Sequence, residues 1–403
     1  VLTLSFFGCS STEDNLDLAA GEDCTLAAVA SDYSSSSVSL LDSQGRVCFA
    51  DYLNSGSAVP GLVTAFSGDL VMPSTPHPQG FLTLIDRYPN SVVSLVDVEE
   101  GVIRNQFSVG PGFAANPQDI FFLSSERAYV SRHEANPSPT DEAADFDEGD
   151  DILIVDPESG EALGRIPLAE YAPPSESGGL FPARPGRMTL IGDYIWTALR
   201  ALSLDFQKGG EGVLVGIDPE LDEVGQTLQL PGARNCGSLK AWASGDGAWG
   251  VCTGVFYDGK DRQVADSEIF RLSVVDGALA LSHRIEAEEL QNRPLGFSLA
   301  VLDSDRVVYL VLGDLDLGED DALHLYDRRD GESVDLGIRA GAYEIGSVSW
   351  LDTMRILLVS KADPVNPGLV RMMFEEDGST SLMDEIDISP GIGLPPRQVG
   401  AFR

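Results

Sequence analysis

Basic residues recur at matching places along a chain that is otherwise strongly acidic. The chain has 26 lysines and arginines against 64 aspartates and glutamates, which gives a formal net charge of -38. Basic side chains follow several apolar runs and precede others, always at the same points of a repeated pattern. If these points share one face of the fold, they focus positive charge inside a negative surface and would select a carboxylate or phosphate. The predicted ligand-binding residues are Arg87, Arg132, His133, Arg187, Arg200, Lys361 and Arg397.

The same basic residues have a structural alternative. Each could pair with an aspartate or glutamate of the long acidic loops, so that ion pairs line the fold and no ligand is involved. A single arginine does not separate the two interpretations, and only the positional recurrence favours a ligand. The sequence leaves both open.

Acidic loops form a second constellation. The loop at 133–151 is dense in aspartate and glutamate, and the loops at 257–268 and 313–321 repeat this composition. Carboxylates at alternate positions around a glycine suit Ca²⁺, which takes about six to eight oxygen ligands. The alternative is a solvated acidic loop without a metal. The candidate calcium ligands are Asp145, Asp147 and Asp150.

The sequence gives little support for catalysis by a nucleophile. No Gly-x-Ser-x-Gly elbow and no phosphate-binding P-loop motif occurs. Among the four histidines, only His133 falls on the expected site face beside a carboxylate, Glu134. The negative charge repels phosphate backbones, so we expect no nucleic-acid partner. The chain is therefore more simply interpreted as a binder than as an enzyme, although the sequence does not decide the question.

The first residues resemble the end of a bacterial lipoprotein signal. An apolar stretch at 1–7 meets Gly8 and Cys9, and a polar, acidic segment follows. Residues 1–8 would be the signal remnant, and Cys9 would be lipidated at the start of a tether at 9–23. Leucine is usual where Phe6 stands, and no basic segment precedes the apolar stretch. The resemblance implies an exported protein held at the cell envelope by its lipid, with no other membrane contact.

The remaining cysteines agree with an oxidising compartment. Cys236 and Cys252 flank a predicted hairpin and would lie nearly opposite each other, so a disulfide is expected. Cys24 and Cys48 bracket the first repeat and could join the N-terminal strands. The alternative for all four is a reduced, buried thiol.

A repeated element must position these residues. A short apolar strand runs into an acidic turn seven times, roughly 50–60 residues apart, which is the spacing of four-stranded propeller blades with long loops. A hydrophobic hairpin precedes most copies and would supply the two inner strands of each blade. We predict one all-β, seven-bladed β-propeller over 24–403. The copies lie at 38–45, 93–101, 152–160, 213–222, 269–277, 323–331 and 369–378.

Ring closure follows from an incomplete first blade. Residues 24–53 supply three strands, and an unassigned segment follows the seventh blade at the C-terminal end. Residues 396–402 match the openings of the other inner strands, so we predict that they complete the first blade. Closure of this kind removes two free sheet edges.

The repeat resembles the YVTN-type β-propeller family. AYVSRHEAN followed by ILIVDPESG, together with SDYSSSSVSLLDSQGRV and DRYPNSVVSLVDVEEGVI, is similar to its aromatic-Val-Thr-Asn strand, polar turn and Val-Ser-Val-Ile-Asp strand. The likeness is strong in the first three blades and weak in the last four. It implies an exported or surface propeller, and related rings include lactone hydrolases.

Two functions follow as expectations. The first is an envelope-anchored, monomeric propeller that binds a small anionic ligand or a protein without catalysis. The alternative is a metal-dependent, lactonase-like hydrolase that uses Ca²⁺ on the same face. An enzyme needs converging carboxylates around an open metal position, whereas a binder needs only complementary charge and shape.

Overall fold

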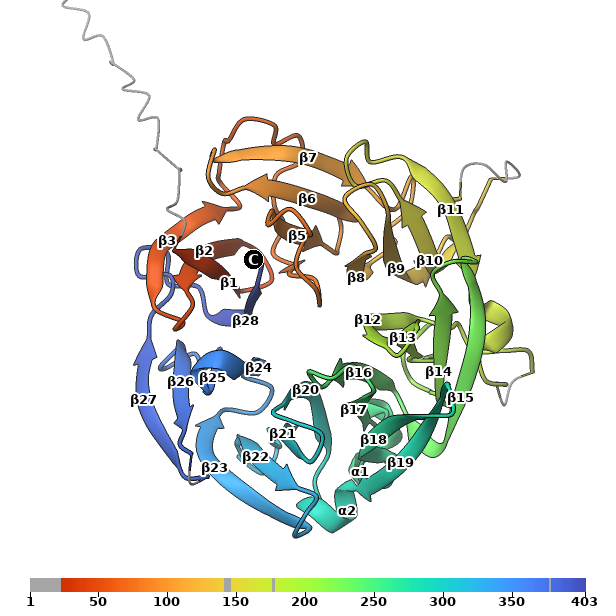
Figure 1. The fold of residues 1–403 in the computed structure, drawn as a ribbon, viewed down its shortest axis with the longest axis vertical. Coiled ribbons are helices and arrows are strands. Elements are labelled where there is room, and N and C mark those ends of the chain that lie inside the picture. The colour runs from red at the N-terminus through yellow and green to blue at the C-terminus, as the bar shows by residue number, and fades with distance from the viewer. Residues whose placement is uncertain (1–22, 141–145, 176–177, 377) are drawn as a thin grey trace, which may run out of the picture.

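The computed structural model describes residues 23–140, 146–175, 178–376 and 378–403. These residues form seven four-stranded antiparallel sheets arranged in a ring (Figure 1). The predicted all-β, seven-bladed β-propeller is confirmed. Residues 1–22, with Cys9 and almost all of the expected tether, lie outside the described residues. No helix of the described chain has the length and apolarity needed to cross a membrane.

Each blade has one strand at the centre of the ring and three further strands that follow outward. From the inner to the outer strand, blade one consists of β28 (Pro396–Ala401), β1 (Cys24–Ser31), β2 (Ser36–Asp42) and β3 (Val47–Asn54), and blade two of β4 (Leu70–Val71), β5 (Leu82–Asp86), β6 (Val92–Asp97) and β7 (Val102–Ser108). Blade three consists of β8 (Pro117–Phe122), β9 (Ala128–Ala135), β10 (Gly149–Val155) and β11 (Ala162–Pro167), and blade four of β12 (Pro185–Ile191), β13 (Tyr194–Leu199), β14 (Glu211–Asp218) and β15 (Glu223–Arg234).

Blades five to seven have the same order. Blade five consists of β16 (Cys236–Ala241), β17 (Gly247–Thr253), β18 (Ser267–Val275) and β19 (Ala278–Glu286). Blade six consists of β20 (Leu295–Val301), β21 (Arg306–Val311), β22 (Asp321–Asp327) and β23 (Glu332–Ala340), and blade seven of β24 (Ile345–Leu351), β25 (Ile356–Lys361), β26 (Gly368–Phe374) and β27 (Thr380–Ile386). The described helices are short: α1 (Lys260–Ala265), α2 (Ala287–Leu290) and three 3₁₀ turns at Ala169–Tyr171, Phe256–Asp258 and Asp352–Met354. Every predicted acidic-turn copy overlaps the third strand of its blade and includes the turn that follows it.

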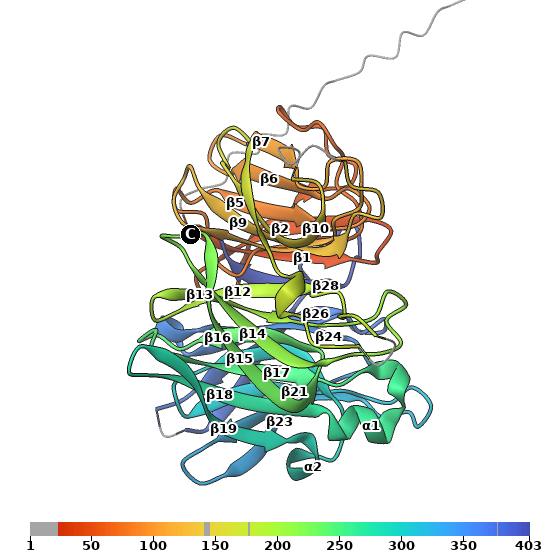
Figure 2. The ribbon, with the colours of Figure 1, turned by 90° about the vertical axis from the view of Figure 1, so that its right-hand side faces the viewer.

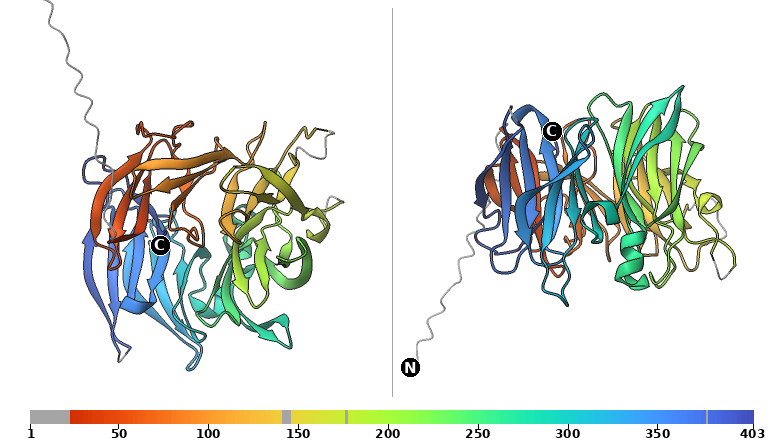
Figure 3. Two further views of the ribbon diagram at one scale, coloured as in Figure 1. Left: turned by 45° about the horizontal axis from the view of Figure 1, so that its top comes forward. Right: turned by 90° about the horizontal axis from the view of Figure 1, so that it is seen from below.

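Burial follows position in the blade. The third strands are buried over most of their length, because both of their faces pack against neighbouring blades; β6, for example, is buried at every position. The outer strands alternate instead, as β15 does over most of its length, because one face meets solvent. The core consists of seven apolar clusters, and each lies between two adjacent blades. The strands of each blade run between the two faces of the disc (Figure 3).

The ring closes where the sequence predicts. β28 pairs with β1, with Leu26 opposite Ala401 and Val29 opposite Gln398. Phe402 follows β28 and is 1% exposed in the core between blades one and two. The predicted disulfides are also present, joining Cys24 to Cys48 and Cys236 to Cys252.

The two faces of the disc differ. The loops that lead into the inner strands, and those between the second and third strands, share one face, which we call the mouth face. Helices α1 and α2 belong to it, and Figure 2 shows them opposite the C-terminus. The backbone N–H of Phe402 donates to the carbonyl of Thr25 (3.1 Å), so the first and last described residues meet on the face away from the mouth.

Candidate functional site

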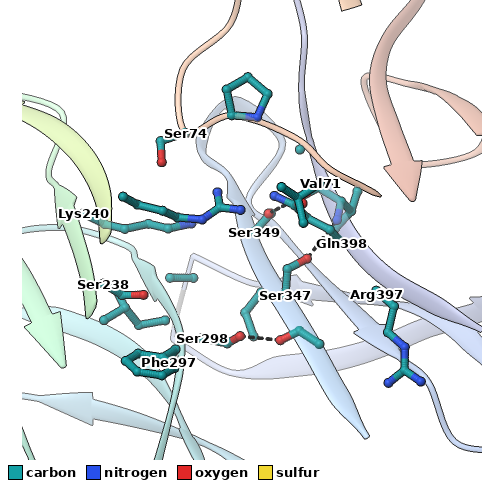
Figure 4. A pocket seen from close by; sticks show the side chains of 18 of the residues that line it. Val71, Ser74, Ser238, Lys240, Phe297, Ser298, Ser347, Ser349, Arg397 and Gln398 are labelled. Carbon is teal, nitrogen blue, oxygen red and sulfur yellow. Dashed lines mark hydrogen bonds between the residues drawn. The ribbon is translucent and has the colours of Figure 1, made fainter. Parts of the chain in front are cut away.

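A cavity of about 610 Å³ runs along the axis of the ring. Its walls are the inner strands of all seven blades, and the loops of the mouth face surround its opening. Figure 4 shows Lys240 projecting from one wall toward the wall that carries Ser349 and Gln398. Asp69 is the only acidic residue among the described lining residues, and no histidine or cysteine is among them. The cavity is therefore basic, although the protein as a whole is acidic.

Side chains of the inner strands fix the wall by binding the backbone of the next blade. Asp119 is fully buried and accepts hydrogen bonds from the backbone N–H groups of Ser74 and Met188, each at 2.8 Å. Gln398 accepts a hydrogen bond from the N–H of Met72 (2.8 Å) and donates one to its carbonyl (3.1 Å). These contacts join blades one to four around the axis, so the cavity wall is rigid and the side chains on it are pre-positioned.

Three basic side chains of this cavity have neither an ion pair nor a hydrogen bond, although the carboxylate of Asp119 attracts Arg187 and Lys240. Among the 26 lysines and arginines, all of which are described, only Arg187, Arg200 and Lys240 have neither an ion pair nor a hydrogen bond. Arg271 and Arg355 also lack an ion pair, but both donate to backbone carbonyls. Arg200 lies over the ring of Phe297 at 4.4 Å, which leaves its N–H edge free.

Enclosure by protein and mutual repulsion both act on these cations. The surrounding protein, and then the charge of Arg187, lowers the pKa of Lys240 to about 8, although the side chain remains exposed to solvent inside the cavity. Burial, followed by repulsion from neighbouring arginines, lowers the pKa of Arg200 to about 10. Burial also lowers the pKa of Arg187, although the carboxylate of Asp119 opposes that change. Each side chain would regain interaction energy if an anion entered the cavity.

Two further arginines line the cavity but are paired. Arg87 donates through Nε to the carboxylate of Asp69 at 3.0 Å. Arg397 donates to Oε2 of Glu344 at 3.4 Å and stacks on the ring of Tyr33 at 4.8 Å. Four of the seven predicted ligand-binding residues, Arg87, Arg187, Arg200 and Arg397, therefore meet in one cavity.

The other three predicted residues lie outside the cavity lining. Arg132 is fully buried and forms a two-point contact with the buried carboxylate of Asp151, at 2.7 Å for each bond. Lys361 pairs with Glu385 at 2.6 Å. His133 is buried, and burial lowers its pKa well below the ordinary value. Arg132 and Lys361 therefore form ion pairs with acidic residues of the protein itself, which is the structural alternative that the sequence left open.

Sequence reasoning missed Lys240. This residue lies inside the inner strand β16, within a run that is otherwise typical of a blade hairpin. The available signal was its rarity, because the chain has only four lysines, and the others lie in a loop, at the start of helix α1 and at a strand end. A charged residue within an inner strand faces either the axis or the next blade, and only the axis admits an unpaired cation.

The predicted calcium ligands are only partly described. Asp145 lies outside the described residues. Asp147 accepts a hydrogen bond from the backbone of Thr140 (3.0 Å), and Asp150 accepts two from the backbone of Ala183 and Arg184 (2.9 and 2.6 Å). Within the described ranges, no group of three or more His, Cys, Asp or Glu side chains is placed to hold a metal ion.

Comparisons with known proteins identify the fold but no family. No protein-family model matches the chain, and no curated protein matches it in sequence. Among solved structures, a candidate 6-phosphogluconolactonase from Bacteroides fragilis is 12% identical with a TM-score of 0.58, covering 94% of this chain and 98% of that one. A second from Bacteroides uniformis is 11% identical with a TM-score of 0.57, covering 94% and 100%. The periplasmic gluconolactonase of Pseudomonas aeruginosa is 12% identical with a TM-score of 0.57, covering 94% and 98%.

Proposed function

We propose that this propeller binds a small anionic ligand, through a carboxylate or phosphate group, in its axial cavity. One observation carries the proposal: the three basic side chains that have neither an ion pair nor a hydrogen bond all line this cavity, in a chain where acidic residues outnumber basic ones by more than two to one. Unpaired, enclosed cations weaken a fold, and sites that break the rules of stability are commonly functional. A bound anion would neutralise Arg187, Arg200 and Lys240 together.

Binding without catalysis fits the lining better than acid–base chemistry does. General catalysis needs a group that can take or give a proton near the substrate, most often a histidine or a carboxylate. Among the described lining residues Asp69 is the only carboxylate and none is a histidine; Asp69 already accepts from Arg87, and Lys240 is the one basic side chain whose pKa falls to about 8. The other lining groups are basic, hydroxyl-bearing or apolar, which suits recognition.

Calorimetric titration tests this proposal. The probes are 6-phosphogluconate, citrate and inorganic phosphate, with glucose as the uncharged control. We expect saturable binding of at least one anion, and roughly a hundredfold loss of affinity in the Arg187→Gln/Lys240→Gln double variant, because charge-assisted contacts contribute about 1.5–3 kcal/mol each. Lys361→Gln is the matched control, since Lys361 lies outside the cavity. Absence of binding by every anion, or equal binding by the double variant, would refute the proposal.

A lactonase-like hydrolase is the second candidate. The observation that favours it is the shared fold with the lactonases compared above, together with a basic cavity that would suit a phosphorylated lactone. In this version Ca²⁺ would be held by loop carboxylates that include Asp147 and Asp150. The test is hydrolysis of 6-phosphogluconolactone, followed by pH-stat with added Ca²⁺ and with EDTA. A rate above the spontaneous one that EDTA abolishes would favour this enzyme over a simple binder.

We also propose that Cys9 carries a lipid that holds the protein at a bacterial cell envelope. The described chain begins on the face away from the mouth, so an anchor there would leave the cavity open to the surroundings. Partition of the full chain into detergent, and its loss in Cys9→Ser, is the expected result. Equal partition of both proteins would contradict the anchor.

A further inference from the structure

Six large apolar side chains stand exposed on the mouth face, in loops of blades five to seven. All are between 43% and 80% exposed. Exposed apolar side chains that gather in one region mark interaction surfaces in soluble proteins. We call these residues the apolar patch: Phe256, Tyr257, Leu315, Leu317, Tyr343 and Val365.

Contacts between aromatic rings connect this patch to the edge of the axial cavity. The ring of Phe256 lies 5.2 Å from that of Tyr257 and 6.0 Å from that of Tyr343, with the rings edge to face. Tyr343 also lines the axial cavity. Its backbone has φ of 65°, a left-handed conformation that is unfavourable for a bulky side chain and collects at functional sites. The same tyrosine therefore belongs to both the patch and the cavity.

Polar contacts hold the remaining loops of the patch beside these rings. Lys260 of α1 binds the carboxylate of Asp314 at 2.7 Å, which joins the blade-five loop to the blade-six loop that carries the two leucines. The backbone N–H of Ala362 donates to the carbonyl of Glu344 (2.7 Å), which brings the blade-seven loop next to the segment of Tyr343. The patch is thus a surface fixed by three blades.

The chemistry of the patch restricts its occupant. Carbohydrates stack on aromatic faces flanked by hydrogen-bonding groups, whereas half of this patch is leucine and valine. An anionic bilayer would be repelled by the carboxylates of Asp316 and Asp363, which lie beside the apolar residues in sequence. An occupant therefore has apolar side chains, no negative charge along its body, and one anionic group at the end that enters the cavity.

We propose that the mouth face binds the C-terminal segment of a partner protein. The free α-carboxylate enters the axial cavity toward Arg187 and Arg200, and the apolar side chains of the last residues cover the patch, a known mode of chain-end recognition. Basic residues just before the apolar end would suit the acidic neighbours of the patch. This inference rests on the proposed anion-binding function and names the anion's source.

Paired peptides test it directly. The probes are fluorescent hexapeptides that begin Lys-Gly-Lys and end in combinations of Phe, Leu and Val, each made as a free acid and as a C-terminal amide. By fluorescence anisotropy with the full chain, we expect the free acids to bind and the amides to bind roughly tenfold to a hundredfold more weakly, because a charge-assisted contact is lost. Arg187→Gln should reduce binding of the free acid alone.

Surface variants separate the patch from the cavity. Leu317→Ser should weaken the free-acid peptides by roughly tenfold, the effect of removing one buried leucine. Leu382→Ser is the matched control, since Leu382 is similarly exposed on the outer strand β27, and it should change nothing. Equal binding of acid and amide, or no peptide binding while 6-phosphogluconate still binds, would overturn the inference and leave anion binding intact. Failure of every anion and every peptide would overturn both.

Discussion

Replacing Lys240 by methionine is expected to stabilise the protein when no anion is bound. Its side chain has no ion pair or hydrogen bond and shares the cavity with Arg187. The pKa of Lys240 falls from 10.5 to about 8, and a pKa difference of this size corresponds to about 3 kcal/mol of cost to the charged form. Water reaches the side chain inside the cavity and screens the charge, so we expect a gain of about 1 kcal/mol in the free energy of unfolding.

The gain has a defined dependence on pH. In the unfolded chain Lys240 has its ordinary pKa of 10.5, while in the folded chain its pKa is about 8. Between these values the unfolded state binds more protons than the folded state, so the contribution of this group to stability rises with pH. The cost of the charged lysine is complete below about pH 8 and is relieved toward pH 10.5. The advantage of Lys240→Met should therefore be largest at neutral pH and nearly absent at high pH.

Urea unfolding at pH 7 and pH 10, in buffers without polyvalent anions, measures both effects. Lys361→Met is the control, because Lys361 is paired with Glu385 and its replacement should not stabilise the protein. A Lys240→Met variant that is less stable than the parent at pH 7 would refute the reasoning. An advantage that stays the same at pH 10 would refute it as well, since it would then come from packing.

Two further predictions concern the ring itself. Phe402→Ala should lower the free energy of unfolding by about 3–5 kcal/mol, because the side chain is buried where the ring closes. Urea unfolding measures this change. A loss below about 1 kcal/mol would mean that the closing segment is dispensable. Arg132→Met should cost about 1.5–3 kcal/mol, because the buried Asp151 loses one of its two arginine partners and keeps Arg165, yet leave the affinity for 6-phosphogluconate unchanged in calorimetry; weaker anion binding would instead give Arg132 a role in the site.

The fold could be predicted because its signals are local and repeated. Each blade contributes a hairpin and an acidic turn, and the even spacing of these units determines the ring without knowledge of any long-range contact. The closing strand was predictable for a complementary reason: the first blade lacked an inner strand and the segment at 396–402 had no partner. The observed strand, Pro396–Ala401, agrees with that prediction. The likeness to the YVTN repeat, which no family model supports, stays a prediction.

The site was less predictable because it depends on which way a strand residue points. Arg132 and Asp151 are direct cross-strand neighbours on β9 and β10, a pairing that only the register of the two strands reveals. Lys240 and Arg187 are separated in sequence by the other three strands of blade four, yet both line the axial cavity. A shift of one residue in the pleat would have turned either side chain toward the next blade. Spacing along the sequence shows which end of a strand a charged residue occupies. It does not show whether the side chain points toward the axis or toward the next blade.

The closure of the ring by β28 also sets the order in which the molecule can be completed. Blade one needs residues from both ends of the described chain, so its second strand, β1, keeps an open edge until residues 396–401 have left the ribosome. A chain that stops short of residue 396 exposes that edge permanently, and open edges recruit other strands. Truncated copies should therefore be removed by proteolysis or aggregate, and only finished molecules should persist.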